Sequence, residues 1–346
     1  MTDPIRGSLA TVASGEPLDA AAAESFMAAV LDGEVSPAQL AAVLMGMRVR
    51  GEQADELTGF VRAMRSRAVA VIAPDGTIDI CGTGGDIHST FNVSTAASIV
   101  TAAAGVPIAK AGNRAVSSVS GSSDVMAALG LTVEQGSSEA EASLREEGYA
   151  YLHAPAFHPG MRHAGPVRME LGVRTAFNLI GPIANPARPR RQLMGVPDEN
   201  AARKAAATLQ ALGSERAFVV TGDRIDELPL DDSGVIFDVS PDGIVRIEVT
   251  AADHGLPRSP TDELEGGDAT TNAATIEAIL EGREHGPRRH VVVLNSGAAL
   301  MAAGRAGDLR EGVGRAADTI DSGAAKALLE RLRERARARV AAVGTT

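Results

Sequence analysis

The hydrophobic pattern of the chain changes at Pro74-Asp75-Gly76, and this change constrains the fold more than any other feature of the sequence. Before it, residues 18–30, 36–47 and 52–67 carry apolar residues at the spacing of amphipathic helices. Ser36-Pro37 supplies an N-terminal cap followed by proline at the first helical position. We find no strand pattern before the turn. The sequence therefore predicts a small all-helical domain over residues 1–72.

After the turn, short apolar runs alternate with helical segments. Runs at 78–81, 106–109, 217–220 and 291–294 read as strands that end in polar loops, and helical patterns over 92–105 and 122–129 follow the first two. Strands that alternate with helices predict a mostly parallel central sheet with helices on both faces. Alternation over 231–249 predicts a small antiparallel excursion. We therefore expect an α/β fold, with a larger α/β domain over residues 73–346.

Composition narrows the classes of function. The chain of 346 residues has one cysteine, Cys81, so it can form neither an internal disulfide nor a cysteine metal cluster, which fits a reducing cytoplasm. A net charge of -11 and 3% aromatic residues disfavour nucleic-acid binding, which needs a basic face and gains from base stacking. No apolar run approaches the roughly 18 residues of a membrane helix, and no signal-peptide core follows Met1. We expect a cytoplasmic protein without nucleic-acid or membrane partners.

Two loops suited to anions follow the first two predicted strands. Cys81-Gly82-Thr83-Gly84-Gly85-Asp86 ends the first strand, and its glycines let backbone N–H groups approach an anion, although a plain tight turn could use the same residues. The segment 110–118 follows the second strand and offers Lys, Arg, Asn and Ser, although a solvated loop is the alternative. Parallel strands deliver such loops side by side at one edge of the sheet. Together they indicate a ligand with more than one phosphate.

Other segments carry polar groups whose interpretation stays open. Asn92-Val93-Ser94-Thr95 opens a predicted helix, where N–H groups and hydroxyls bind anions or merely cap the helix. Asp226-Glu227 suits Mg²⁺ bridged to phosphate oxygens, although such a pair is usually a surface feature. Arg168 could hold a carboxylate in a bidentate pair.

Histidine and cysteine give no support for zinc or for covalent catalysis. His158 and His163 are not spaced for one helical face, so we do not expect zinc. We find no Ser-His-Asp or Cys-His constellation. Cys81 precedes the glycine-rich loop and is predicted to be a small buried residue and not a nucleophile.

The order of these blocks along the chain is itself informative. They are Gly-Thr-Gly-Gly-Asp (82–86), Asn-x-Ser-Thr (92–95), Lys-x-Gly-Asn-Arg (110–114), Ser-Gly-Ser-x-Asp (120–124), His-Pro-x-Met-Arg (158–162), Arg-Thr-x-Phe-Asn-x-x-Gly-Pro (174–182) and Asp-Glu (226–227). Gly266-Gly267-Asp268, Asn272-Ala273 and Leu294-Asn295 extend the match along nearly the whole chain. In this order they resemble the anthranilate phosphoribosyltransferase family. The resemblance implies a nucleoside phosphorylase/phosphoribosyltransferase-like fold, a helical domain that also recruits helices near 162–182, and a homodimer.

The resemblance also implies an activity and a set of site residues. Family members join anthranilate to 5-phosphoribosyl 1-pyrophosphate in tryptophan biosynthesis and release pyrophosphate. The implied donor-binding residues are Gly82, Gly85, Asp86, Thr90, Asn92, Val93, Ser94, Thr95, Lys110, Ala111, Gly112, Asn113, Arg114, Ala115, Val116, Ser117, Ser118 and Ser122. Gly82, Asn113 and Arg168 would meet anthranilate, with Arg168 facing its carboxylate. Mg²⁺ would be held by Ser94, Asp226 and Glu227.

No acid, base or nucleophile is assigned. Because the attacking group is a neutral aromatic amine, catalysis can rest mainly on holding the two substrates in line.

The chain departs from the family's pattern at two places. Ala111 stands where the family usually has histidine near the anthranilate region, and Arg224-Ile225 stands where Gly-Leu is common. A related glycosyltransferase or nucleoside phosphorylase with another acceptor therefore stays open as an alternative. A non-catalytic relative that binds nucleic acid is a second alternative, which the acidic net charge and the intact Asp226-Glu227 pair oppose.

Overall fold

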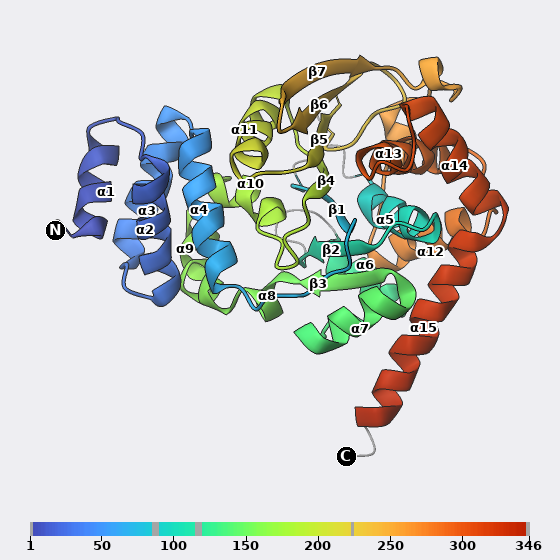
Figure 1. Ribbon diagram of the computed structural model, residues 1–346, viewed down its shortest axis with the longest axis horizontal. Helices are drawn as coiled ribbons and strands as arrows, with labels where there is room; N and C mark the ends of the chain where they lie inside the picture. Colours follow the sequence, from blue (N-terminus) through green and yellow to red (C-terminus); the bar gives the residue numbers. More distant parts are fainter. Residues whose placement is uncertain (1–2, 85–89, 115–119, 223–224, 344–346) are drawn as a thin grey trace.

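A helical N-terminal part precedes a larger α/β part with a mostly parallel sheet, as the sequence predicts (Figure 1). The structure is a computed structural model that describes residues 3–84, 90–114, 120–222 and 225–343. The predictions made for Gly85, Asp86, Ala115, Val116, Ser117, Ser118 and Arg224 lie outside the described residues.

Four helices form the N-terminal part: α1 (Pro4–Ala13), α2 (Ala20–Asp32), α3 (Pro37–Arg50) and α4 (Ala54–Arg67). Ser36 caps α3 as predicted, because its Oγ accepts the N–H of Gln39 while the Gln39 side chain accepts the N–H of Ser36. The apolar faces of these helices meet around the fully buried Phe26, Val43 and Phe60. The three predicted helices are confirmed. Helix α1 was not predicted, and it buries only two residues of its own.

Two helices from the middle of the chain pack against this N-terminal part. They are α9 (Gly165–Leu171) and α10 (Ala176–Ile183), of which α9 contacts α3 and α10 contacts α4 (Figure 1). The ring of Phe177 on α10 lies 6.5 Å from that of Phe60 on α4, between centroids. The same hydrophobic cluster therefore joins segments more than a hundred residues apart in sequence.

A seven-stranded sheet in the order β3-β2-β1-β4-β5-β6-β7 forms the centre of the α/β part. Its strands are β1 (Ile78–Gly82), β2 (Ile108–Gly112), β3 (Tyr149–His153), β4 (Arg191–Gly195), β5 (Arg216–Thr221), β6 (Gly234–Ser240) and β7 (Gly243–Val249). The first five strands pair in parallel, and β6 and β7 pair antiparallel. The mostly parallel sheet and its antiparallel excursion are confirmed. Strands β3 and β4 were not predicted.

Helices cover both faces of the sheet. The remaining ones are α5 (Val93–Ala103), α6 (Ser122–Ala128), α7 (Ser137–Glu147), α8 (Ala154–Phe157), α11 (Glu199–Ala211), α12 (Ala269–Leu280), α13 (Pro287–Ala302), α14 (Leu309–Asp321), α15 (Ala324–Val343) and the 3₁₀ helices η1 (Pro159–His163), η2 (Ala252–His254) and η3 (Thr261–Leu264). Ile80 and Phe218 point to the face that packs with α5, α13 and α15. Met194 and Val219 point to the opposite face, with α10 and α11.

The prediction of a strand at 291–294 was wrong. Val291, Val292, Val293 and Leu294 lie inside α13, and each is fully buried. Helix α13 packs against α5, α14 and the sheet, so its middle is buried all round. A short, continuously apolar run has no period that separates such a buried helix from a buried strand.

Candidate active site

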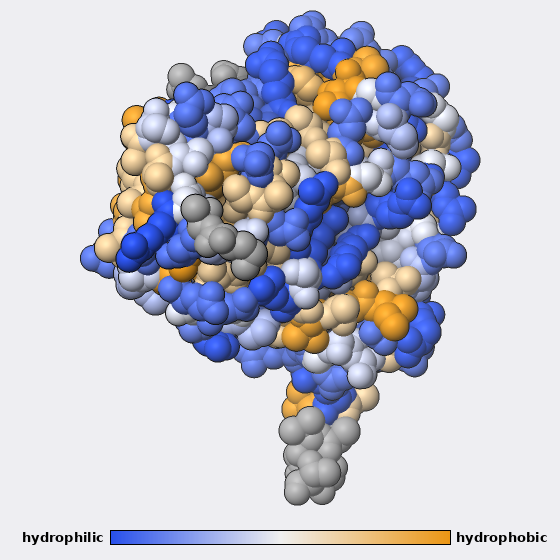
Figure 2. Space-filling model, turned by 60° about the vertical axis from the view of Figure 1, so that its left-hand side comes forward, coloured by the Kyte–Doolittle hydropathy of each residue, from blue (hydrophilic) through white to orange (hydrophobic). Residues whose placement is uncertain are grey.

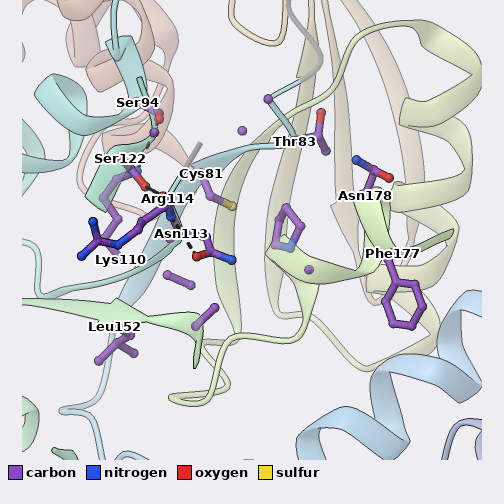
Figure 3. Close-up of a pocket in the computed structure, with 18 of the residues that line it drawn as sticks. Cys81, Thr83, Ser94, Lys110, Asn113, Arg114, Ser122, Leu152, Phe177 and Asn178 are labelled. Atoms are coloured by element: carbon purple, nitrogen blue, oxygen red, sulfur yellow. Dashed lines mark hydrogen bonds between the residues drawn. The ribbon is translucent and has the colours of Figure 1, made fainter. Parts of the chain in front are cut away.

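A cavity of about 590 Å³ opens where β1 and β2 end, and α9 and α10 form its other side. Figure 3 shows Lys110 and Asn113 on one side of it and Phe177 and Asn178 on the other. The predicted site residues that line the cavity are Gly82, Thr90, Asn92, Val93, Ser94, Lys110, Ala111, Gly112, Asn113, Arg114, Ser122, Arg168, Asp226 and Glu227. Thr95 does not line it, because its side chain is fully buried in the first turn of α5. The structure thus brings segments from across the sequence to one place.

Two strand ends leave room for Asp226. A Cβ on Gly82, the last residue of β1, would lie 2.5 Å from Oδ2 of Asp226, and a Cβ on Gly195, the last residue of β4, would lie 1.6 Å from its backbone oxygen. The N–H of Gly84 donates to Oδ2 of Asp226 at 2.8 Å. The close approach of Asp226 thus favours glycine at position 82, in addition to the ligand approach that the sequence predicts. Gly195 was missed, since nothing local in the sequence marks it.

The acidic pair is part of the cavity wall and not a solvated surface feature. Asp226 and Glu227 are each 7% exposed, and both line the cavity. The side chain of Asn295 on α13 bonds both backbone groups of Leu228, accepting its N–H at 2.9 Å and donating to its oxygen at 3.1 Å. This two-point attachment fixes the backbone directly after Glu227. The role of Asn295 could not be predicted from sequence, because it depends on a contact across 67 residues.

The start of α5 is held by polar contacts that do not cap the helix. Asn92 occupies the N-cap position but makes no side-chain cap bond. Its Oδ1 accepts from Nδ2 of Asn272 at 3.0 Å, and its own Nδ2 donates to the oxygen of Ser120 at 3.4 Å. The interpretation of Asn92 as a simple cap is therefore wrong. Its contacts instead join α5 to α12 and to the loop before α6, beside the cavity.

Lys110 lies within β2 and not in the loop after it, because β2 ends three residues later than the sequence predicts, at Gly112. Its ammonium is buried, and it donates to the oxygen of Ile80 at 2.6 Å and to Oγ of Ser94 at 3.3 Å. Burial lowers the pKa of Lys110, while the nearby carboxylates of Asp79, Glu227 and Asp226 oppose that shift. Lys110 therefore places a compact cation in the cavity wall between the two loops.

Arg168 faces the cavity from α9. Its guanidinium lies over the ring of Phe177, 5.0 Å from the centroid, and burial lowers its pKa. The aromatic face orients the guanidinium plane while leaving its N–H groups free to point elsewhere. Arg168 is thus suited to bind a planar carboxylate on the side of the cavity opposite Lys110 and Asn113.

Sequence reasoning missed further polar residues around the cavity. Asp79 in β1 is fully buried, and its carboxylate accepts from Asn185 at 2.9 Å and from the N–H of Ala111 at 3.2 Å. Burial raises the pKa of Asp79 to about 6, against the lowering effects of the Asn185 bond and the Lys110 charge. Arg174, between α9 and α10, donates to the oxygens of Thr83 and Gly84 at 3.4 Å. For Asp79 the available signal was an acidic residue inside an apolar strand, and for Arg174 it was its place at the start of the block 174–182.

The sulfur of Cys81 is buried, as predicted. Nε2 of Gln192 donates to Sγ at 3.1 Å, and burial raises the pKa of this thiol well above its usual range. A thiol that resists ionisation is a poor nucleophile. The interpretation of Cys81 as a small buried residue is confirmed.

Comparison with known proteins agrees with this architecture. The model of the glycosyl transferase family helical bundle domain matches residues 7–68, and that of the glycosyl transferase family a/b domain matches residues 74–326. An anthranilate phosphoribosyltransferase from Rubrobacter xylanophilus is 46% identical over 328 residues, which cover 94% of this chain and 96% of the relative. The chain belongs to the anthranilate phosphoribosyltransferase family.

Solved structures of the anthranilate phosphoribosyltransferase family share the whole fold. The enzyme from Thermus thermophilus superposes with a TM-score of 0.90 at 40% identity, covering 95% of this chain and 99% of that one. The enzyme from Saccharomyces cerevisiae, in complex with PRPP and Mg, superposes with a TM-score of 0.87 at 24% identity, covering 96% and 98%. The helical part and the α/β part described above therefore recur together in the family.

Proposed function

We propose that this chain transfers the phosphoribosyl group of 5-phosphoribosyl 1-pyrophosphate to anthranilate, giving N-(5-phosphoribosyl)anthranilate and pyrophosphate, a step of tryptophan biosynthesis. The observation that carries the proposal is the convergence, at one cavity, of the loop after β1, the end of β2, the acidic pair and Arg168. Membership in the anthranilate phosphoribosyltransferase family supports the same reaction.

The donor would bind where β1, β2 and α5 meet. Backbone N–H groups of the glycine-rich loop, the hydroxyls of Ser94 and Ser122 and the Lys110 ammonium supply hydrogen bonds to phosphate oxygens. Oγ of Ser122 is held 2.8 Å from the hydroxyl of Tyr151, which fixes its position. Gly85, Asp86 and residues 115–118, outside the described residues, complete the donor set that we propose.

Anthranilate would bind between the two sides of the cavity. Arg168 would hold its carboxylate, while Gly82 and Asn113 would contact it from the β1 and β2 side. The amine is neutral and needs no strong base, so the residues act by holding it in line with the anomeric carbon of the donor. Backbone N–H groups of the protein near the leaving pyrophosphate would stabilise the negative charge that develops there.

The carboxylates of Asp226 and Glu227, with the hydroxyl of Ser94, fit Mg²⁺, which takes oxygen ligands and bridges carboxylates to phosphates. Within the described residues no group of three or more His, Cys, Asp and Glu could hold a metal by itself. Substrate or water oxygens would therefore complete the coordination. When bound, the cation would offset negative charge on the pyrophosphate. The solved yeast relative contains PRPP and Mg.

We further propose two domains and a homodimer. Residues 1–72, joined by helices near 162–182, would form one domain and residues 73–346 the other. Figure 2 shows a face dominated by polar residues, on which apolar residues form small groups. Val49 on α3 and Met169 on α9, two helices in contact, are 83% and 74% exposed. Large apolar side chains so exposed favour an interface between copies through these helices.

The location that we propose is the cytoplasm. Among the described helices, none combines the length and the apolar character needed to cross a membrane. The sole cysteine and the small-molecule chemistry of the site support the same location.

The proposed reaction is tested by anthranilate fluorescence with purified protein, phosphoribosyl pyrophosphate and Mg²⁺. We expect the signal to fall only when all three are present. If the signal stays constant while the donor still binds in a Mg²⁺-dependent way, the acceptor is a different molecule, and Ala111 is the first position to examine. If neither reaction nor donor binding occurs, the proposed function is wrong.

A further inference from the structure

The backbone hydrogen bonds between β1 and β2 stop near the beginning of the two strands. These two strands lie wholly in the described part of the chain, and they register at one pair, Ile78↔Ile108. By contrast, β1 with β4 and β2 with β3 each register over five pairs. The backbone hydrogen-bond ladder between the two central strands therefore stops before their carboxyl ends, which lie at the edge of the sheet where the cavity opens.

Side chains occupy the positions of the next rung. At this register a continued parallel ladder would join the N–H of Ala111 to the oxygen of Ile80, and the oxygen of Ala109 to β1. Instead, Oδ1 of Asp79 accepts the N–H of Ala111 at 3.2 Å, and Nδ2 of Asn185 donates to the oxygen of Ala109 at 2.8 Å. On the other side of the strands, Lys110 donates to the oxygen of Ile80 at 2.6 Å.

Asp79 and Asn185 act as one unit. Nδ2 of Asn185 donates to Oδ2 of Asp79 at 2.9 Å, and Oδ1 of Asn185 accepts the N–H of Ala187 at 2.8 Å. The two side chains are 0% and 1% exposed, and neither lines the cavity. Burying a carboxylate is costly, so a buried Asp that replaces an ordinary ladder bond needs a compensating role. That role is to fix the two strand ends from which the cavity loops continue.

We propose that Asp79 and Asn185 are positioning residues for the transfer reaction, because they join the end of β1 to the end of β2 in place of ladder bonds and so set the spacing of the two substrate-binding loops. The loop from Gly82 continues β1, and Gly112-Asn113 continue β2, so each loop moves with its strand. A change in how these two strand ends are joined would shift the loops relative to one another and alter the cavity between them. The inference rests on the proposed function, because it concerns the alignment of the two substrates.

The test uses graded variants of the full-length protein. Asp79→Ala removes the bonds of Asp79 to Asn185 and to the N–H of Ala111. Asp79→Asn keeps an oxygen that can accept the N–H of Ala111 but turns an amide toward the amide of Asn185. Asn185→Ala removes the side chain that bonds Asp79. Glu56→Gln is the control, because Glu56 is also a fully buried carboxylate that accepts backbone N–H groups, from Leu18 at 3.1 Å and Gln53 at 2.9 Å. It pairs with Arg50 and does not line the cavity. For each variant we would measure kcat, both KM values and the melting temperature.

We expect Asp79→Ala to lower kcat by about 100-fold, the loss typical of a misplacement near 1 Å, and to raise KM for the donor. Asp79→Asn should retain more activity than Asp79→Ala. The double variant of Asp79 and Asn185 should lose no more than the worse single one, as coupled residues do. Glu56→Gln should keep kcat and both KM values within about twofold while its melting temperature falls.

Several results would overturn the inference. One is a kcat within twofold of the parent in Asp79→Asn and Asn185→Ala with only lower melting temperatures, which would make the pair purely structural. Another is a double variant whose loss of kcat equals the combined losses of the two single variants, which would show that Asp79 and Asn185 act independently. If Asp79→Ala does not fold, the other two single variants still decide the question. A parent protein that carries out no phosphoribosyl transfer would refute the proposed function itself, whereas an active parent with near-normal variants refutes only the positioning role.

Discussion

Replacing Gly195 with alanine tests whether the position of Asp226 controls activity. A Cβ at Gly195 would lie 1.6 Å from the backbone oxygen of Asp226 and 2.6 Å from its carbonyl carbon. Since carbon atoms pack at about 3.5–4 Å, the Asp226 backbone or the end of β4 must shift by about 2 Å. The φ angle of Gly195 is not in the positive region, so the effect comes from this contact and not from backbone strain.

The expected loss follows from that displacement. A misplacement of about 1 Å in a positioned group costs about 100-fold, so Gly195→Ala should lower kcat/KM at least that far. The Mg²⁺ concentration for half-maximal activity should rise, because Asp226 is a proposed ligand. Gly82→Ala should have a smaller effect, since its Cβ would meet only the carboxylate end of Asp226, at 2.5 Å.

The assay is the rate of anthranilate consumption over a Mg²⁺ titration. Gly314→Ala in α14 is the control, because no atom lies within 4 Å of its added Cβ. It should leave the activity unchanged and stabilise the fold by roughly 0.5–1 kcal/mol. A folded Gly195→Ala protein with the parent's kcat/KM and Mg²⁺ dependence would refute the link between this glycine and the acidic pair.

Three other predictions follow from single residues. Arg168→Ala should raise KM for anthranilate by about 10- to 100-fold with little change in KM for the donor. Arg203→Ala is the control, because it removes an arginine that lies 5.8 Å from the centroid of a ring outside the cavity, and it should leave KM for anthranilate unchanged. Unchanged anthranilate kinetics in Arg168→Ala would contradict the assignment. Burial lowers the pKa of His158 to about 4, so the neutral imidazole should contribute fully to the free energy of unfolding above about pH 6.5. That free energy should fall by about 3 kcal/mol as the pH decreases toward 4. Urea unfolding of His158→Gln should lack this part of the pH dependence. Ser36→Ala should destabilise the protein by about 1 kcal/mol in the same assay, and a change below a few tenths would show that the cap of α3 contributes little.

The elements that the sequence predicts well are those whose pattern is local. The run 78–81, its glycine loop and the helix after it follow one another without interruption, and the structure has β1 and α5 there. Strand β4 starts with the polar residues Arg191 and Gln192, so its pattern is weak. Its place between β1 and β5 depends on pairing across the chain, which no local pattern encodes.

The candidate site was predictable to the extent that it lies at strand ends. Loops that follow parallel strands meet at one edge of the sheet, so the blocks from Gly82 and from Lys110 were expected together, and both line the cavity. Asp79, Asn185 and Gly195 were not predictable in this way. Asp79 and Asn185 bond backbone groups where the ladder between β1 and β2 stops, and Gly195 leaves space for a loop about thirty residues away. Such roles appear only when register and packing are known.

The most direct test of the central claim is the stoichiometry of the reaction. Purified protein would be incubated with anthranilate, phosphoribosyl pyrophosphate and Mg²⁺, and the product mass, the anthranilate consumed and the pyrophosphate released would be measured together. We expect N-(5-phosphoribosyl)anthranilate as the product, with one pyrophosphate released per anthranilate consumed. Pyrophosphate release that does not depend on anthranilate, or an unchanged anthranilate pool with active protein, would contradict it.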